Sequence, residues 1–262
     1  MQHPPLSDDE ADALAELVEP YVCPIQLVKK TDTRQPPGYQ FGTGWLVDRN
    51  GVESIVTCEH VAREQSNTQW LAFSCFGGED GAVINSNFHS KCHPIDAAVA
   101  PVAKALAVMK GRRSKCVTAS LLAASHSPVA GELFYTYGFP GVDAKQMFGT
   151  QIAQGMGVFL REVELEEAVF QEPQPHPTEM HICLAWSPKH AVPMLGTHGA
   201  LSLPNGMSGS PLWNTRYEEI RLHGGKWSPS NARVVGMIWG HSAKACQLYA
   251  TPIDVLVREL SL

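Results

Sequence analysis

Residues 203–212 read LPNGMSGSPL, and they place small residues on both sides of one serine, Ser208. Glycine neighbours allow backbone angles that other side chains forbid, and they let a second backbone approach the hydroxyl closely. By itself the stretch also fits an ordinary turn rich in glycine, serine and proline. Two segments further upstream help to decide between these interpretations.

The first upstream segment places a histidine directly after an apolar run. Residues 42–47 read GTGWLV and residues 55–62 read IVTCEHVA, with an Asn-Gly turn between them. Asn-Gly is typical of a tight hairpin, because both residues tolerate positive φ angles. The hairpin would hold His60 at the end of a buried strand, although one histidine among eleven is weak evidence alone.

The second upstream segment, HPIDAAVA at residues 93–100, places Asp96 in front of a short apolar strand. A carboxylate in this position would be partly buried and would need a partner, and a histidine N–H is a suitable one. Taken alone, Asp96 would be interpreted as a turn or cap residue at a strand end.

The three side chains occur in the order His60, Asp96, Ser208, which is the order of the chymotrypsin catalytic triad. With these blocks the chain resembles the trypsin-like serine peptidases, especially bacterial members, here without an appended PDZ domain. The resemblance extends from about Phe41 to the C-terminus. Three further segments carry it: residues 137–141 (YGFPG), 235–240 (VGMIWG) and 249–252 (YATP).

The resemblance implies a role for each residue of the triad. Ser208 would attack the scissile carbonyl, His60 would accept and return the proton, and Asp96 would orient His60. The backbone N–H groups of Gly206 and Ser208 would form the oxyanion hole. This chemistry proceeds through an acyl-enzyme intermediate and needs no metal and no organic cofactor.

The resemblance also implies two sets of substrate-binding residues. Ser202 and Leu203 would belong to the primary specificity pocket, and a serine there, instead of an acid, predicts a preference for an uncharged side chain. An edge formed by Ile238, Trp239 and Gly240 would pair with an extended peptide as an added strand.

The expected fold is mainly β, with two antiparallel six-stranded β-barrels of the chymotrypsin type, a short N-terminal helix and a C-terminal helix. Many short apolar runs separated by glycine and proline agree with barrels. Strands are expected at residues 44–47, 54–57, 70–76, 97–102, 133–137, 157–163, 181–186, 234–239 and 247–250. The chain divides into an N-terminal helical segment (1–22), a barrel with His60 and Asp96 (23–108), a linker (109–130), and a barrel with Ser208 and the terminal helix (131–262).

Local signals define the helices and one loop. Ser7 and Glu10 fit a capping box at the start of the N-terminal helix. Thr251 is expected to cap the C-terminal helix, with Pro252 in its first position. Residues 162–179 are acidic and contain three prolines, which predicts an exposed loop.

Composition narrows the setting and the partners. The net charge of −6 does not favour nucleic acid or an anionic membrane surface. No apolar run approaches the length of about 18 residues that spans a bilayer, and no secretory signal is evident. The seven cysteines are odd in number and irregularly spaced, which predicts free thiols and a cytoplasmic location.

The sequence therefore predicts a serine endopeptidase that acts on polypeptides, together with a regulatory or activating protein partner. The main alternative is a catalytically inactive, protease-like module that binds peptides or partners. An esterase of the α/β-hydrolase type would need glycine where Ser210 stands and the order serine, acid, histidine. A zinc site built from Cys58, His60, His89, Cys92 and His93 lacks the spacing of common structural sites.

Overall fold

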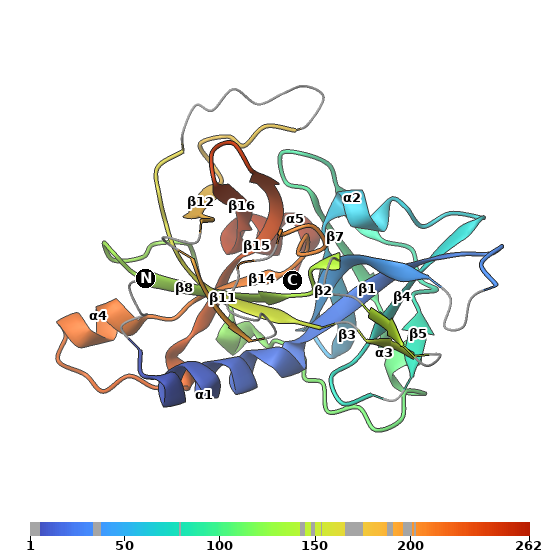
Figure 1. Ribbon diagram of the computed structural model, residues 1–262, viewed down its shortest axis with the longest axis horizontal. Coiled ribbons are helices and arrows are strands. Elements are labelled where there is room, and N and C mark those ends of the chain that lie inside the picture. Colours follow the sequence, from blue (N-terminus) through green and yellow to red (C-terminus); the bar gives the residue numbers. More distant parts are fainter. Residues whose placement is uncertain are drawn as a thin grey trace.

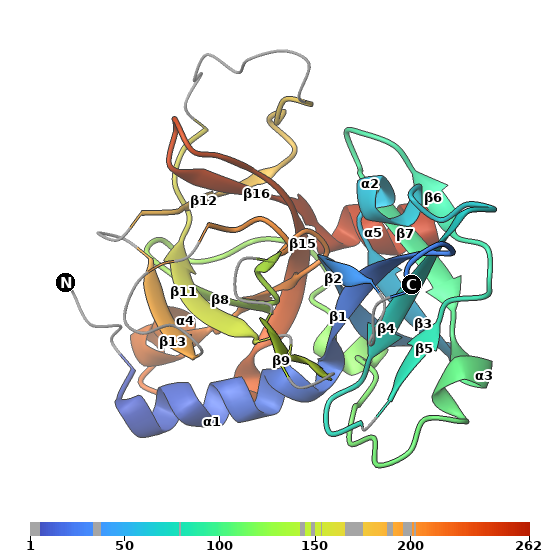
Figure 2. The ribbon, with the colours of Figure 1, turned by 45° about the vertical axis from the view of Figure 1, so that its right-hand side comes forward.

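Two antiparallel sheets lie side by side in the computed structural model, which describes residues 6–33, 38–78, 80–141, 145–147, 150–152, 154–165, 175–187, 191–195, 201 and 203–262 (Figures 1 and 2). Each sheet has seven strands, and a separate two-stranded pair accompanies them. The first sheet is built from the N-terminal part of the chain and the second from the C-terminal part.

The first sheet has the strand order β5-β4-β1-β2-β3-β7-β6. Its strands are β1 (Val22–Lys29), β2 (Tyr39–Arg49), β3 (Val52–Thr57), β4 (Gln69–Ser74), β5 (Gly81–Val83), β6 (His89–Lys91) and β7 (Ala97–Pro101). The second sheet has the order β12-β16-β15-β14-β8-β11-β13. Its strands are β8 (Leu133–Gly138), β11 (Met156–Arg161), β12 (Ile182–Ala185), β13 (Val192–Leu195), β14 (Pro211–Asn214), β15 (Arg233–Ser242) and β16 (Gln247–Pro252). The separate pair is β9 (Lys145–Met147) and β10 (Thr150–Ile152).

The predicted mainly β fold with a helix near each end is confirmed, but each sheet has seven strands where six were expected. All nine predicted strands are present, with small shifts at their ends. The unpredicted β5, β6 and β13 are edge strands of three or four residues, too short to show alternation. The unpredicted β1 and β14 contain Pro24 and Pro211, and proline is a poor strand signal because it cannot donate to a ladder.

The helices are short and lie around the sheets. They are α1 (Asp8–Val18), η1 (Glu19–Tyr21), α2 (Glu59–Ala62), α3 (Ala103–Leu106), η2 (Ala119–Leu121), α4 (Tyr217–Leu222), η4 (Pro229–Asn231) and α5 (Ile253–Leu260). The predicted capping box of α1 is confirmed, because the Ser7 hydroxyl accepts from the Glu10 N–H while the Glu10 carboxylate accepts from the Ser7 N–H. The helix runs along the base of the second sheet, beside β13 and η4 (Figure 2).

One continuous apolar cluster joins the two sheets. It contains Trp45 and Phe73 from the first sheet and Tyr135 and Trp213 from the second, and these side chains are fully buried. Tyr21 extends the cluster toward the N-terminal helix, with its ring centroid 5.7 Å from that of Trp213. Closely packed interiors deform little, so this shared core fixes one sheet relative to the other.

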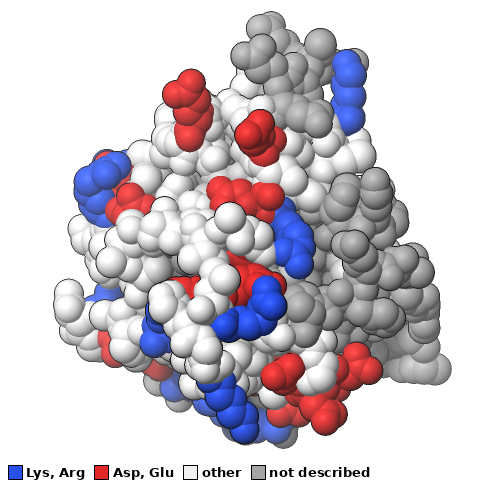
Figure 3. Space-filling view, turned by 90° about the vertical axis from the view of Figure 1, so that its left-hand side faces the viewer, with Lys and Arg blue, Asp and Glu red and all other residues white. Residues whose placement is uncertain are grey.

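The surface carries mixed charges. On the face shown in Figure 3, basic and acidic side chains are interspersed, in agreement with the modest net charge of −6. Among the described residues, no helix combines the length and the apolar composition that a bilayer crossing requires.

A buried carboxylate organises the start of α4. Glu132 is 2% exposed, and its Oε1 accepts from the N–H groups of Leu133 and Glu218 at 2.9 and 3.1 Å. Its Oε2 accepts from the Glu219 N–H at 3.1 Å. The residue before α4, Arg216, has a φ of 57° and provides no side-chain cap, so Glu132 satisfies the first-turn donors from a distant part of the chain.

Replacement of Glu132 by glutamine should lower the free energy of unfolding by about 1–3 kcal/mol, because an amide nitrogen would face donors that need an acceptor. Urea denaturation of Glu132→Gln beside wild type measures this loss. Glu16→Gln, an exposed change on α1, should stay within about 0.5 kcal/mol of wild type. Equal denaturation midpoints for wild type and Glu132→Gln would contradict the role given to this carboxylate.

Candidate active site

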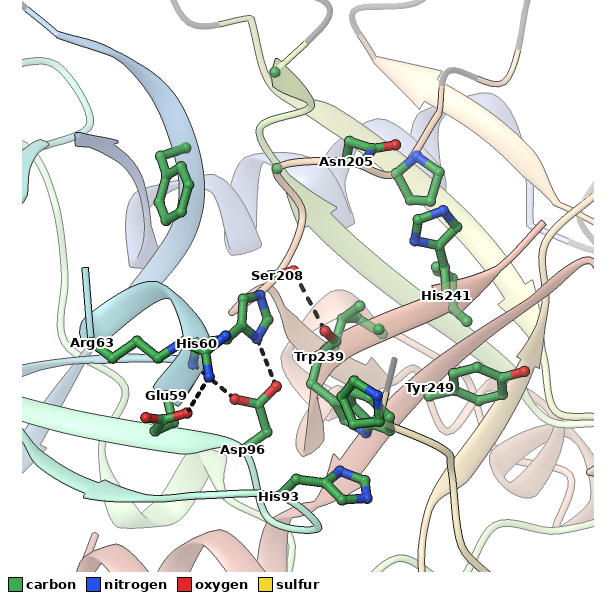
Figure 4. A pocket seen from close by; sticks show the side chains of 18 of the residues that line it. Glu59, His60, Arg63, His93, Asp96, Asn205, Ser208, Trp239, His241 and Tyr249 are labelled. Carbon is green, nitrogen blue, oxygen red and sulfur yellow. Dashed lines mark hydrogen bonds and ion pairs between the residues drawn. The ribbon is translucent and has the colours of Figure 1, made fainter. Parts of the chain in front are cut away.

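A cleft of about 940 Å³ is lined by residues from both halves of the chain (Figure 4). The N-terminal half contributes Gln40, Phe41, Glu59, His60, Arg63, Cys92, His93 and Asp96. The C-terminal half contributes Gly141, Pro175, Pro204, Asn205, Gly206, Ser208, Ile238, Trp239, Gly240, His241, Leu248 and Tyr249. The cleft therefore brings together the predicted residues His60, Asp96, Gly206, Ser208, Ile238, Trp239 and Gly240.

Strand pairing brings His60 and Asp96 together. Strands β3 and β7 are antiparallel neighbours, with Thr57 opposite Ala98. His60 follows the end of β3, and Asp96 precedes the start of β7, so both lie at the same end of the pair. Residues that are far apart in the sequence thus become neighbours through one ladder.

The Asp96 carboxylate holds His60 at two points. Its Oδ2 lies 2.7 Å from His60 Nδ1, and its Oδ1 accepts from the backbone N–H of His60 at 3.0 Å (Figure 4). Asp96 is 3% exposed and has a φ of 44°, a left-handed conformation. An ionised carboxylate only accepts, so Nδ1 carries the proton and the neutral ring presents Nε2 as an acceptor.

The loop that carries Ser208 depends on two glycines with positive φ. Gly206 has a φ of 98° and Gly209 a φ of 94°. A Cβ on Gly206 would lie 2.7 Å from both the Gly141 nitrogen and the Phe139 oxygen, and a Cβ on Gly209 would collide with the Thr43 carbonyl oxygen. Space as well as backbone angle therefore demands glycine on both sides of Ser208.

Thr43 in β2 ties this loop to the first sheet. Its N–H donates to the Ser208 carbonyl at 2.9 Å, and its hydroxyl donates to the Gly206 carbonyl at 2.8 Å. The same hydroxyl accepts from the Phe139 N–H at 3.0 Å, and the Thr43 carbonyl accepts from the Thr57 hydroxyl at 2.8 Å. Thr43 is fully buried, so these bonds are shielded from water.

The Ser208 hydroxyl points to a backbone carbonyl. It donates to the Trp239 oxygen at 3.5 Å, which is long for an O–H···O bond. The N–H groups of Gly206 and Ser208 have no hydrogen-bond acceptor among the residues that the structure describes. Both belong to residues lining the cleft.

Cys58 lies buried beside the His60–Asp96 pair, and its thiol donates to the Ile238 carbonyl at 3.3 Å. Burial, together with the negative charge of Asp96, raises the pKa of this thiol well above its ordinary value. In the described part of the chain, Cys58, His60 and Asp96 form the one group with metal-ligand spacing. In this structure the Asp96 carboxylate binds the His60 ring and the Cys58 thiol donates to a carbonyl, so each of the three side chains has a protein partner. The zinc alternative also required His89, Cys92 and His93, which are not in this group.

Two histidines pack beside the Trp239 ring: His93, considered above only as a zinc ligand, and His181, for which no role was predicted. The ring centroids of His93 and His181 lie 5.3 and 5.0 Å from that of Trp239. His181 is 7% exposed, its Nε2 donates to the Pro94 carbonyl at 2.7 Å, and its Nδ1 accepts from the Thr178 N–H at 2.8 Å. Pro94 precedes Asp96 by two residues, so His181 helps to fix the Asp96 loop. No local sequence signal could reveal a contact across 87 residues.

The prediction that Thr251 caps the C-terminal helix is wrong. Pro252 is the N-cap of α5, and the Thr251 hydroxyl donates to the Ile95 carbonyl at 2.8 Å. Thr251 is fully buried, and its distant partner in the Asp96 loop competes successfully with the local cap. This bond is a second support for the backbone next to Asp96.

The predicted substrate-binding residues lie at different places. Ile238, Trp239 and Gly240 lie in β15, where a bulge leaves Trp239 without a partner in β16. Strand β14 begins with Pro211 opposite Met237, and the next residue of β15, Ile238, donates to the Ser210 carbonyl at 2.9 Å and accepts from the Gly209 N–H at 2.7 Å. Beyond Ile238, β15 has a neighbouring strand on one side only among the described strands. Leu203 is 61% exposed and does not line the cleft, and Ser202 lies outside the described residues.

Comparison with known proteins gives three findings. The family model described as the trypsin-like peptidase domain matches residues 42–220. Two structures of the Rv3671c protease from M. tuberculosis, an active form and an inactive mutant form, are similar with a TM-score of 0.53 and 13% sequence identity. These matches cover 100% of this chain and 91% and 95% of the other chains, and they support the predicted fold type. The comparison with curated protein sequences finds no match.

Substitution of Gly209 by alanine should destabilise the protein by several kcal/mol, because the new methyl group would collide with the Thr43 carbonyl. Gly224→Ala is a matched control, since Gly224 also has a positive φ, of 68°, but has open space around it. The control should lose about 1 kcal/mol. Urea denaturation measures both losses, and equal losses would contradict the steric role of Gly209.

Stability should fall with acid partly through His181, because burial lowers its pKa in the folded protein. The unfolded chain then takes up a proton near pH 6.5 that the folded protein resists, so stability is complete above this pH and decreases below it. His181→Gln should therefore show a smaller loss of unfolding free energy than wild type between pH 7 and pH 5. His223→Gln, at an exposed site, should follow wild type. An unchanged pH dependence in His181→Gln would refute this assignment.

Proposed function

The chain belongs to the trypsin-like peptidase domain family, and on this premise we propose that it is a serine endopeptidase that hydrolyses protein substrates through an acyl-enzyme intermediate. The observation that carries the proposal is the 2.7 Å contact between His60 and a buried Asp96 in the cleft that also contains Ser208. A histidine oriented by a buried carboxylate is the arrangement that activates a serine hydroxyl.

In the proposed reaction, Ser208 Oγ attacks the scissile carbonyl while His60 Nε2 accepts its proton. The hydrogen bonds to Asp96 place the ring proton on Nδ1 and stabilise the imidazolium that forms. The present bond from Ser208 to Trp239 is long, so a rotation about the Ser208 side-chain bond costs little and brings Oγ toward His60. His60 then donates the proton to the leaving amine, and water hydrolyses the acyl-enzyme.

The N–H groups of Gly206 and Ser208 would stabilise the oxyanion of the tetrahedral intermediate. Their position is fixed by Thr43, which binds the carbonyls of the same two residues. Loss of one oxyanion donor typically raises a barrier by about 2.7–4 kcal/mol. A rigid loop of this kind provides the stabilisation without reorganisation during the reaction.

The substrate would bind as an additional strand along β15. Beyond Ile238, β15 has no neighbouring strand on the side of β14 among the described strands, and Trp239 and Gly240 line the cleft. Main-chain hydrogen bonds to such an edge give affinity that is independent of the peptide sequence. The geometry thus suits an extended polypeptide better than a small ester.

The residue before the scissile bond would carry an uncharged side chain. The described carboxylates that line the cleft are Glu59 and Asp96. Glu59 Oε2 lies 3.8 Å from Arg63 Nη1, and Asp96 Oδ2 lies 2.7 Å from His60 Nδ1. Because both carboxylates already have a partner, neither is available for a lysine or arginine of the substrate. The lack of an available carboxylate among the described cleft residues agrees with the preference that Ser202 implies.

The proposal extends to the setting of the enzyme. All seven cysteines have free thiols, which supports the predicted cytoplasmic location. A regulatory or activating partner could act by turning the Ser208 hydroxyl from Trp239 to His60. The inactive, partner-binding alternative is the weaker proposal, because the paired His60 and Asp96 serve no purpose in a module that only binds.

Purified protein should hydrolyse unfolded casein, and Ser208→Ala should abolish this activity. Asp96→Asn should reduce kcat/KM by about 10⁴, because an amide stabilises the wrong tautomer of His60. Asp254→Asn, in the first turn of α5, is the control and should keep wild-type activity.

The same assay with a peptide library should place uncharged residues before the cleaved bonds. Activity that survives in Ser208→Ala, or a strict requirement for lysine or arginine, would contradict the proposed site. Absence of cleavage by wild type would favour the partner-binding alternative.

A further inference from the structure

Two cysteine thiols lie close together at the first sheet, and neither residue lines the cleft. Cys23 is in β1 and is fully buried, and Cys75 directly follows β4 and is 6% exposed. Each thiol shifts the pKa of the other, which places the two sulfurs close together. Neither belongs to the proposed reaction, so their arrangement needs a separate explanation.

Continuation of the strand register brings these cysteines opposite each other. Strands β1 and β4 are antiparallel, and their ladder ends with Ile25 opposite Phe73. Continued by two residues, this register brings Cys23 opposite Cys75 on the same side of the sheet. Opposed residues of antiparallel strands have Cα atoms about 4.5–5.5 Å apart, which lies within the span of a disulfide.

The surroundings give the two sulfurs different reactivity. The hydrogen bond from Cys23 lowers the pKa of Cys75 to about 7 against the effect of burial, and the positive charge of Arg112 contributes. The same contact, with burial, raises the pKa of Cys23 well above its ordinary value. A third thiol nearby, Cys116, is different, because burial and the charge of Glu53 raise its pKa to about 11. Cys75 is therefore the nucleophile of the group and Cys23 the thiol that stays protonated.

We propose that Cys23 and Cys75 are a redox-active pair that a hydroperoxide oxidises to a disulfide between β1 and β4. This inference concerns a site separate from the proposed catalytic centre and does not depend on proteolytic activity. The oxidant is a small peroxide, hydrogen peroxide or an organic hydroperoxide, because only a small molecule can reach the Cys75 thiolate, which is 6% exposed.

The proposed oxidation has two steps. The Cys75 thiolate attacks a peroxide oxygen, a sulfur–oxygen bond forms, the oxygen–oxygen bond breaks, and the second oxygen leaves as water or an alcohol after taking up a proton. The Cys23 sulfur then attacks the sulfenic acid of Cys75, and the hydroxyl leaves as water with the proton of Cys23. Two thiols lose two electrons in total, and the peroxide gains them. A thiol reductant reverses the change by disulfide exchange.

The disulfide would join neighbouring strands of the sheet that supports the site. Strand β1 also pairs with β2, where Cys23 lies opposite Gly44, next to Thr43. A crosslink that closes a loop of about fifty residues restricts the unfolded chain and should raise Tm by about 5–10 °C. Oxidation would thus stiffen the sheet without removing a group that touches the substrate.

The test treats the purified, reduced full-length protein with a slight excess of hydrogen peroxide and analyses it by mass spectrometry without reductant. The expected product has lost about 2 Da, contains a linked pair of peptides with Cys23 and Cys75, shows the higher Tm, and returns to the starting state with dithiothreitol. In Cys23→Ser, Cys75 should stop at the sulfenic acid, which dimedone traps.

Two control variants keep the test specific. Cys116→Ser should still form the disulfide, because this thiol lies beside the pair without being part of it. Cys92→Ser should also form it, because Cys92 is an exposed thiol outside the group. Oxidation of Cys92 and Cys246 while Cys23 and Cys75 stay reduced would overturn the proposal. A disulfide that includes Cys116 would overturn it as well.

Discussion

The hydrogen bonds of Thr43 are the constraint on which the arrangement of the site depends. Through one buried residue, strand β2 binds the carbonyls of Gly206 and Ser208, the N–H of Phe139 and the hydroxyl of Thr57. The serine loop belongs to the second sheet, whereas the histidine and aspartate belong to the first. Thr43 therefore links the two parts of the candidate site. The Thr43 carbonyl also packs closely against Gly209, so the loop that carries Ser208 has no room to shift.

The part of the site that contains His60 and Asp96 is also held by several separate contacts. The ladder between β3 and β7 brings His60 to Asp96, and the loop before Asp96 receives two bonds from the second sheet, His181 to Pro94 and Thr251 to Ile95. The second sheet thus supports the loop that carries Asp96, and the first sheet supports the loop that carries Ser208. A site assembled in this way is preorganised, which is the property that electrostatic catalysis requires. The Cys23–Cys75 pair lies at β1 and β4, and β1 is the neighbour of the strand that carries Thr43, so the proposed disulfide would act on the site through β1 and β2.

The sequence predicted the main features and missed those that depend on distant partners. His60, Asp96 and Ser208 could be proposed because each lies in a recognisable segment and the three follow one another in the order of the triad; the structure places all three at one cleft, while their catalytic roles stay a prediction. The capping box of α1, which is confirmed, is a local pattern. Strands β1 and β14 were missed because each contains a proline, and Thr251 was misread because its real partner, Ile95, is 156 residues away. The roles of Glu132, His181 and Cys23 follow from strand register and burial, which no single segment displays. Ser202 lies outside the described residues, so its proposed role in specificity stays a prediction.

The most direct test of the central claim is labelling of the purified protein with a fluorophosphonate probe, followed by mass spectrometry to locate the modified residue. We expect one label on Ser208, absent from both Ser208→Ala and His60→Ala, because only an oriented histidine makes this hydroxyl nucleophilic. Labelling of another residue, or equal labelling of wild type and His60→Ala, would contradict it. Absence of any label on the folded wild-type protein would also contradict the proposed role of Ser208.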